Sequence, residues 1–170
     1  MRELGDWILF KAFYEESRYI TYIQGLDRNQ LFTMVFDTGA VNTVISLKTF
    51  TNRAVDRKKL KEILSRKTAS KAFRSVSGHQ LKGYLVCADG VKLSGFDIGR
   101  FYYYLILDAE ESVSLLGNDF ISCCHFSHDE KSDIIIRGFN RELYESEYEG
   151  LAEAVDAEVV EGFIGECLMS

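Results

Sequence analysis

Short segments rich in aromatic and β-branched residues recur along the first 110 residues of this chain. Gly, Asn or Asp lies near many of the breaks between them, as is typical of strands joined by turns. Many short strands at this spacing predict a mainly β fold, either a small closed β-barrel or a sandwich. The predicted strands cover residues 7–14, 19–24, 31–36, 43–46, 72–76, 81–87, 91–93, 102–107 and 133–137, with a turn at Ala88-Asp89-Gly90.

Helical patterns interrupt the strands at three places. Residues 55–65 carry a sparse apolar face and many basic side chains, and they predict one inserted basic helix. A short helix is expected after Gly117, with Phe120 and Ile121 packed inward. Residues 147–162 have apolar side chains at helical spacing, which predicts an amphipathic helix that docks on the body of the protein or on a partner subunit.

Charge is distributed unevenly along the chain. Residues 53–74 hold nine Lys and Arg against Asp56 and Glu62, whereas residues 141–170 hold nine acidic residues against Arg141 alone. One interpretation is two solvated faces, and another is that the acidic tail and the basic helix attract each other within or between subunits. We expect no nucleic acid partner, because the chain has a net charge of −6 and no recognised binding motif accompanies the basic helix.

Residues 34–40, Met-Val-Phe-Asp-Thr-Gly-Ala, hold the strongest candidate for chemistry. An apolar strand delivers Asp37 to a fixed place, Thr38 supplies a hydroxyl, and Gly39 is expected to allow a tight backbone turn. A carboxylate held this rigidly is a candidate for acid–base catalysis. The structural alternative is a turn carboxylate that accepts backbone hydrogen bonds.

Asp37-Thr38-Gly39-Ala40 resembles the catalytic loop of the aspartic proteases. About 40 residues later, residues 76–80 (Val-Ser-Gly-His-Gln) lie in a hairpin-like setting where such enzymes carry a flap. Residues 114–121 (Ser-Leu-Leu-Gly-Asn-Asp-Phe-Ile) are similar to the apolar-apolar-Gly motif that opens a short helix in that family. In this order and spacing the three motifs resemble the retropepsin-like group of single-lobe aspartic proteases, over roughly residues 30 to 140.

The resemblance implies a small closed β-barrel of the retropepsin-like type, which we assign to residues 1–140. The charge and apolar spacing of residues 141–170 predict an acidic, helical C-terminal tail. The resemblance also implies peptide hydrolysis without a cofactor or a metal, with Asp37, Thr38 and Gly39 as the catalytic residues. The residues expected to bind substrate are Ala40, Asn42, Ser77, Gly78 and His79. The alternative for the last three is an ordinary hairpin turn.

Two residues depart from the family pattern. Val41 replaces the small or polar residue that usually follows the loop, and Asn118 stands where viral members often place an Arg that pairs with an acid near the loop. Because Val41 and Asn118 cannot form that ion pair, the surface that it supports must be built differently in this chain.

Hydrolysis of this kind needs two carboxylates that share one proton, and the chain carries a single Asp-Thr-Gly. Asp119 is the other candidate, but its place after Gly117 indicates a helix-start or turn residue. We therefore expect the second carboxylate to be Asp37 of another copy, because a twofold dimer places the same residue on both sides of its axis. The leading hypothesis is a homodimeric aspartic endopeptidase that acts on an extended peptide or a polyprotein. The alternative is a non-catalytic retropepsin-like module that binds peptides or partners.

The remaining features favour a cytoplasmic protein without a membrane partner. The N-terminal residues lack the long apolar region of a signal peptide, and the longest apolar runs are too short to span a bilayer. The four cysteines lack metal-ligand spacing, and without a secretion signal they are expected to be buried free thiols. They are Cys87, Cys123, Cys124 and Cys167.

Overall fold

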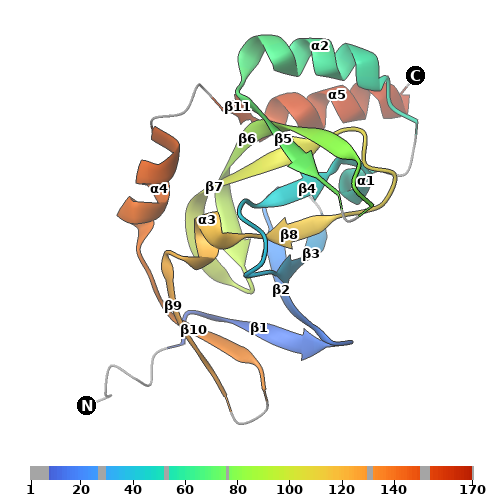
Figure 1. The fold of residues 1–170 in the computed structure, drawn as a ribbon. Helices are drawn as coiled ribbons and strands as arrows, with labels where there is room; N and C mark the ends of the chain where they lie inside the picture. The colour runs from blue at the N-terminus through green and yellow to red at the C-terminus, as the bar shows by residue number, and fades with distance from the viewer. Residues whose placement is uncertain are drawn as a thin grey trace.

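Six strands close into a barrel in the computed structural model, which describes residues 8–26, 30–51, 54–75, 77–129, 132–149 and 154–169. The strand order around the barrel is β2-β3-β8-β4-β7-β6, and β6 pairs with β2 to close the circle (Figure 1). The β3–β8 and β4–β7 pairs are parallel and the other pairs around the circle are antiparallel, so the barrel is mixed. The closed β-barrel predicted from the sequence is confirmed. Its strands are β2 (Arg18–Gln24), β3 (Leu31–Phe36), β8 (Ser114–Leu116), β4 (Val44–Ser46), β7 (Phe96–Ile106) and β6 (Gln80–Leu93).

Five further strands extend the barrel at its margins. β1 (Phe10–Glu15) pairs with β2, and β10 (Ile134–Phe139) and β9 (Cys124–His128) continue outward from β1. β5 (Ser70–Arg74) pairs antiparallel with the first half of β6, and β11 (Val155–Asp156) pairs parallel with Val86 and Cys87 of β6. Trp7, which the sequence assigned to the first strand, lies outside the described residues.

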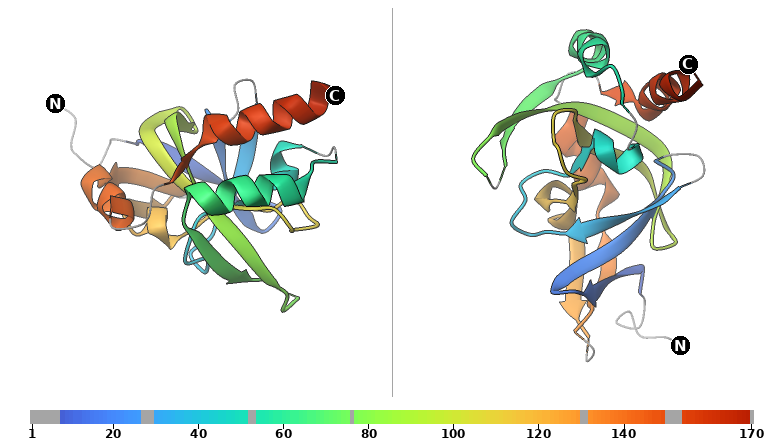
Figure 2. Two further views of the ribbon diagram at one scale, coloured as in Figure 1. Left: turned by 90° about the horizontal axis from the view of Figure 1, so that it is seen from above. Right: turned by 90° about the vertical axis from the view of Figure 1, so that its right-hand side faces the viewer.

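The helices lie on the outside of the barrel. They are α1 (Leu47–Phe50), α2 (Arg57–Lys67), α3 (Asn118–Ile121), α4 (Arg141–Glu149) and α5 (Ala157–Met169). The basic helix is confirmed as α2, which begins at the cap residue Asp56 and buries Leu60 and Leu64. The short helix after Gly117 is confirmed as α3, with Phe120 and Ile121 buried. Figure 2 shows α2 and α5 side by side over one end of the barrel.

The predicted helix over residues 147–162 is wrong in its bounds. α4 ends at Glu149, and α5 begins at Ala157. Between the two helices, Val155 pairs with Val86, so the chain adds a short strand to the edge of β6. The apolar spacing of this segment is helical, but the backbone pairing with β6 overrides it locally.

The predicted turn at Ala88-Asp89-Gly90 is also wrong. β6 continues through these residues, and its register with β7 shifts between Ala88 and Val91. Gly90 has a φ of +71° there, which is typical of a β-bulge. The chain reverses instead at Ser94 and Gly95, whose φ values of +45° and +89° suit a tight two-residue hairpin.

The core fills the barrel and continues beneath α4. Met34, Ile45, Leu85 and Leu93 have almost no exposed surface, and burying each such side chain stabilises the fold by about 1.5–3 kcal/mol. At the α4 end, Phe120 contacts a group of aromatic rings made of Phe10, Phe101, Phe139 and Tyr144. Within the described residues, no helix has both the length and the apolar character that a membrane crossing would need.

Candidate active site

Strand β3 delivers Asp37 to the rim of the barrel. Val35 and Phe36 pair in parallel with Leu115 and Leu116 of β8, and the N–H of Asp37 donates to the carbonyl oxygen of Leu116 at 3.0 Å. Phe36 is buried, whereas Asp37 is partly exposed. The strand therefore fixes the backbone of Asp37 and leaves its carboxylate open to solvent.

Gly39 acts on the carboxylate rather than on the backbone conformation. Its N–H donates to Oδ1 of Asp37 at 2.8 Å. The expected tight turn is present, because the N–H of Ala40 donates to the carbonyl oxygen of Asp37 at 3.2 Å, but Gly39 makes it without a positive φ. A Cβ at this position would lie 3.2 Å from Oδ1 of Asp37, so glycine instead keeps a side chain away from the carboxylate.

The first turn of α3 holds the loop after Asp37 through backbone and side-chain hydrogen bonds. The backbone N–H groups of Asn118 and Asp119 donate to the carbonyl oxygens of Ala40 and Val41 at 2.8 and 3.1 Å. The side-chain amide of Asn118 donates to the carbonyl oxygen of Thr38 at 2.5 Å. Asn118 thus anchors the loop through neutral hydrogen bonds.

Gly117 makes this close approach possible. A Cβ on Gly117 would lie 2.4 Å from both the carbonyl carbon and the oxygen of Asn42. Its φ of −100° is accessible to any residue, so the requirement is for space and not for conformation. Glycine is therefore needed here because the two backbone segments touch.

Asp119 is a buried structural carboxylate. It is 6% exposed and lies in the first turn of α3, as predicted. Its oxygens accept hydrogen bonds from the N–H and hydroxyl of Thr43 (3.0 and 2.8 Å), from the N–H of Phe120 (2.9 Å) and from the phenol of Tyr148. The Thr43 hydroxyl also accepts from the N–H of Gly117 at 3.1 Å. This network fixes Thr43, at the end of the loop that begins with Asp37, against the first turn of α3.

Sequence reasoning missed that α4 belongs to this network. Tyr148 stacks on Tyr102 with ring centroids 4.4 Å apart, and the phenol oxygen of Tyr144 accepts from the N–H of Tyr102 at 2.8 Å. Burial, and then the charge of Asp119, raise the pKa of Tyr148 well above its usual value, so the phenol keeps its proton. The signal in the sequence was the spacing of Tyr144 and Tyr148, which places both rings on one helix face.

The predicted hairpin is confirmed, and β5 and β6 form it. At its tip the N–H of Ser75 donates to the carbonyl oxygen of His79 at 2.8 Å, and the N–H of Gly78 donates to that of Ser75 at 2.9 Å. Gly78 has a φ of +87°, a conformation that favours glycine. Ser77, Gly78 and His79 are exposed; Val76 lies outside the described residues.

One hydrogen bond ties this hairpin to the Asp37 loop. Nζ of Lys71 on β5 donates to Oδ1 of Asn42 at 2.5 Å. The hairpin and the loop accordingly lie on the same side of the molecule (Figure 2). On the loop itself, Thr38 and Gly39 are exposed, Ala40 and Asn42 are partly exposed, and Val41 is 71% exposed. The predicted site residues thus belong to two neighbouring segments.

Two of the cysteines contact α3 and not the Asp37 loop, since the thiols of Cys123 and Cys124 donate to the carbonyl oxygens of Asp119 and Phe120 at 3.5 and 3.6 Å. Cys87 and Cys123 are buried, Cys124 is partly buried, and all three are free thiols. Burial raises the pKa of Cys124 to about 12. The side chain of Cys167 lies outside the described residues. In the part of the chain that the structure describes, no group of three or more His, Cys, Asp or Glu side chains could hold a metal ion.

Neither a family model nor a curated protein matches this sequence. Among solved structures, a retropepsin-like aspartic protease from Rickettsia conorii is similar to this chain, with a TM-score of 0.46 and 17% sequence identity. The match covers 74% of this chain and 87% of that protein. The strand pairing itself gives a closed six-stranded mixed barrel, with the Asp-Thr-Gly loop after β3 held by the segment after β8. This architecture is consistent with the retropepsin-like fold that the sequence predicts.

Proposed function

We propose that this protein is an aspartic endopeptidase that acts as a homodimer. The difference between its two candidate carboxylates carries the proposal. Asp119 is buried and its oxygens accept four hydrogen bonds within the chain. Asp37 is partly exposed, and its carboxylate accepts the N–H of Gly39. Asp37 is therefore the carboxylate that a substrate can reach, and its partner must come from a second copy.

In such a dimer the two Asp37 carboxylates face each other across the twofold axis and share one proton, because two carboxylates a few ångströms apart do not both ionise. The ionised carboxylate takes a proton from a water molecule as the water attacks the scissile carbonyl. The protonated carboxylate donates its proton to the carbonyl oxygen. Collapse of the resulting diol breaks the C–N bond, and a proton passes to the amine that leaves.

The neighbouring residues take supporting roles in this proposal. The exposed Thr38 hydrogen-bonds across the axis and keeps the two carboxylates coplanar. Gly39 offers its carbonyl to the substrate, and Ala40 and Asn42 border the bound peptide. Ser77, Gly78 and His79 close over the peptide from the hairpin tip and exclude water. The bond between Lys71 and Asn42 supports this arrangement, since it holds the hairpin beside the loop.

The direct test is Asp37→Asn assayed with a fluorogenic peptide library at mildly acid pH. The wild-type chain should cleave peptides and be inhibited by pepstatin-type compounds, whereas the variant should lose cleavage and keep its thermal unfolding temperature. Asp108→Asn, which changes an exposed carboxylate elsewhere, is the matched control and should cleave normally. Full cleavage by the Asp37→Asn chain would disprove the proposal.

Mixing the two chains tests the dimer. If each active site needs two Asp37 carboxylates, activity at constant total protein should fall with the square of the wild-type fraction. A monomeric enzyme would instead lose activity in direct proportion to that fraction. Sedimentation at several concentrations should show a two-chain species in the range where activity appears.

The non-catalytic alternative predicts a different pair of results. A binding module would capture extended peptides with the same affinity in the wild-type and Asp37→Asn chains, and neither chain would cleave them.

A further inference from the structure

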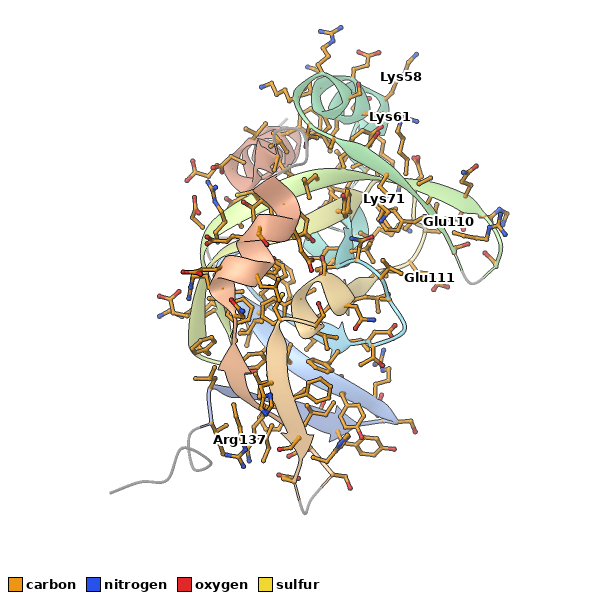
Figure 3. All side chains as sticks on the ribbon, turned by 60° about the vertical axis from the view of Figure 1, so that its left-hand side comes forward. Lys58, Lys61, Lys71, Glu110, Glu111 and Arg137 are labelled. Carbon is orange, nitrogen blue, oxygen red and sulfur yellow. The ribbon has the colours of Figure 1, made fainter. Side chains whose placement is uncertain are left out.

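Helix α2 and strand β5 together present a strongly basic surface. Between Arg57 and Arg74 the chain carries eight Lys and Arg residues against Glu62 alone, so this stretch has a net charge of +7 while the rest of the chain has −13. Figure 3 shows Lys58 and Lys61 on α2 above Lys71 on β5. We call the exposed cations of this stretch the basic surface. Its members are Lys58, Lys59, Lys61, Arg66, Lys67, Lys71 and Arg74.

The described part of the chain places no paired carboxylate on this surface. Among the described residues, no carboxylate forms an ion pair with any of the seven cations, and the close ion pairs join Lys11 to Asp129 and Arg100 to Asp89 elsewhere. Lys71 bonds to Asn42, whose amide oxygen is neutral. Seven cations gathered on two adjoining elements repel one another, so a bound anion would relieve that repulsion.

The basic surface leads to the candidate active site. α2 has 11 residues and is therefore about 16 Å long, which matches roughly five residues of an extended peptide. From α2 the cations continue onto β5, where Lys71 reaches the loop that follows Asp37. A chain bound at Asp37 could thus extend along β5 and α2 without a break.

The surroundings favour a narrow ligand over a wide polyanion. Glu110 and Glu111 lie beneath Lys71 in Figure 3. α5 lies beside α2 in Figure 2, and it carries the exposed acid Glu158 in its first turn, directly after the exposed Asp156 of β11. A nucleic acid duplex wide enough to cover α2 would also meet these acids. The apolar residues Leu60 and Leu64 of α2 are buried against the core, so they are not available to insert into a lipid bilayer.

We infer that the basic surface binds an acidic segment of a polypeptide, next to the segment held at Asp37. Naming that polypeptide as the substrate rests on the proposed peptidase function; the binding itself does not. The surface would select proteins that carry several Asp or Glu residues a few positions from the bond to be cleaved.

The experiment measures binding in the full-length Asp37→Asn chain, so that hydrolysis plays no part. The probe is a fluorescein-labelled peptide of about twelve residues in which half are Glu, and its partner is the same peptide with Gln at those positions. Fluorescence anisotropy should show at least tenfold tighter binding of the Glu peptide at low salt, and this preference should shrink as salt rises toward the physiological range.

Matched charge reversals locate the binding. Lys58→Glu/Lys61→Glu should weaken binding of the Glu peptide at least tenfold. The control, Arg18→Glu/Lys92→Glu, makes the same change in net charge at exposed residues of β2 and β6, and it should weaken that binding less than threefold. Equal losses in both double variants, or equal binding of the Glu and Gln peptides, would overturn the inference. Tighter binding of a DNA duplex or of phosphatidylserine vesicles than of the Glu peptide would overturn it too.

Cleavage by the wild-type chain separates the two proposals. If neutral peptides are cleaved and the Glu peptide is not preferred, the inference about the basic surface is wrong, while the proposed peptidase function is supported. If the Glu peptide binds through α2 while no peptide is ever cleaved, the proposed peptidase function is wrong, while the inference about the basic surface is supported.

Discussion

The phenol of Tyr148 on α4 donates a hydrogen bond to the buried carboxylate of Asp119 on α3. Asp119 in turn binds Thr43, at the end of the loop that begins with Asp37. A helix near the C-terminus therefore helps to fix the conformation of the candidate catalytic loop, more than 100 residues earlier in the sequence.

Tyr148→Phe should lower the free energy of unfolding by about 1.5–3 kcal/mol, because it removes a hydrogen bond to a buried charged group. Urea unfolding measures the loss. Tyr22→Phe is the matched control, since the Tyr22 phenol makes only a long, exposed contact of 3.5 Å with Glu15; it should change stability by less than about 0.5 kcal/mol. Equal effects of the two substitutions would contradict the structural role of Tyr148.

Asp119→Asn and Asp37→Asn should separate stability from activity. The amide at position 119 has one acceptor oxygen, and its N–H₂ group would meet donors of Thr43 or Tyr148, so we expect a loss of about 2–4 kcal/mol. Asp37 is partly exposed, so Asp37→Asn should change the free energy of unfolding by less than about 1 kcal/mol. Thermal and urea unfolding of both variants check this, and a larger loss at position 37 would show that Asp37 is structural.

Gly117→Ala should destabilise the protein by about 1–3 kcal/mol, because the new Cβ would lie 2.4 Å from the backbone of Asn42 and force the two segments apart. Gly162→Ala serves as the control. A Cβ there meets nothing within 4 Å, and the residue lies inside α5, so this variant should gain about 0.5–1 kcal/mol. Urea unfolding that showed no loss for Gly117→Ala would mean that the loop and α3 can separate freely.

Stability should fall as the pH rises above about 9. Burial raises the pKa of Cys124 to about 12 and raises those of Tyr144 and Tyr148 above their usual values. The folded state therefore holds these protons more tightly than the unfolded state. Their contribution is complete below the unfolded pKa values and is lost as the pH rises toward the folded ones, by about 1.4 kcal/mol per pH unit for each group within its window.

Urea unfolding at pH 7, 9 and 10.5 would measure this decline. Cys124→Ala should flatten the curve between pH 9 and 10.5, because the alanine variant has no thiol to deprotonate at that site. A free energy of unfolding that stays constant over this range would show that these groups are not held protonated by the fold.

Some elements of the fold could be predicted from short stretches of sequence. The bounds of β3 were predicted as Leu31–Phe36, and the structure has the same strand. The carboxylate at its end, the hairpin with Gly78 at its tip and the helix after Gly117 could also be predicted. Each depends on neighbours within a few residues, such as an apolar run, a glycine with positive φ or the first turn of a helix.

Other elements have no such local signal. β8 spans only Ser114–Leu116, and β9 is a mostly exposed strand with two histidines, so neither shows a periodic apolar pattern. The helix predicted over residues 147–162 failed because Val155 pairs with Val86, and that contact cannot be read from the spacing of the tail.

The sequence by itself determined that Asp37 follows a buried strand and that Gly39 follows it two positions later. The place of Asp119 after Gly117 also indicated a helix-start residue. Only the tertiary structure decided how exposed each carboxylate is. Their exposure is set by partners that the chain brings from far away. Tyr148 and Thr43 surround Asp119, whereas Lys71 bonds to Asn42 and leaves Asp37 partly open. Burial and hydrogen bonding are sums over all neighbours in space, and no window of the sequence contains them.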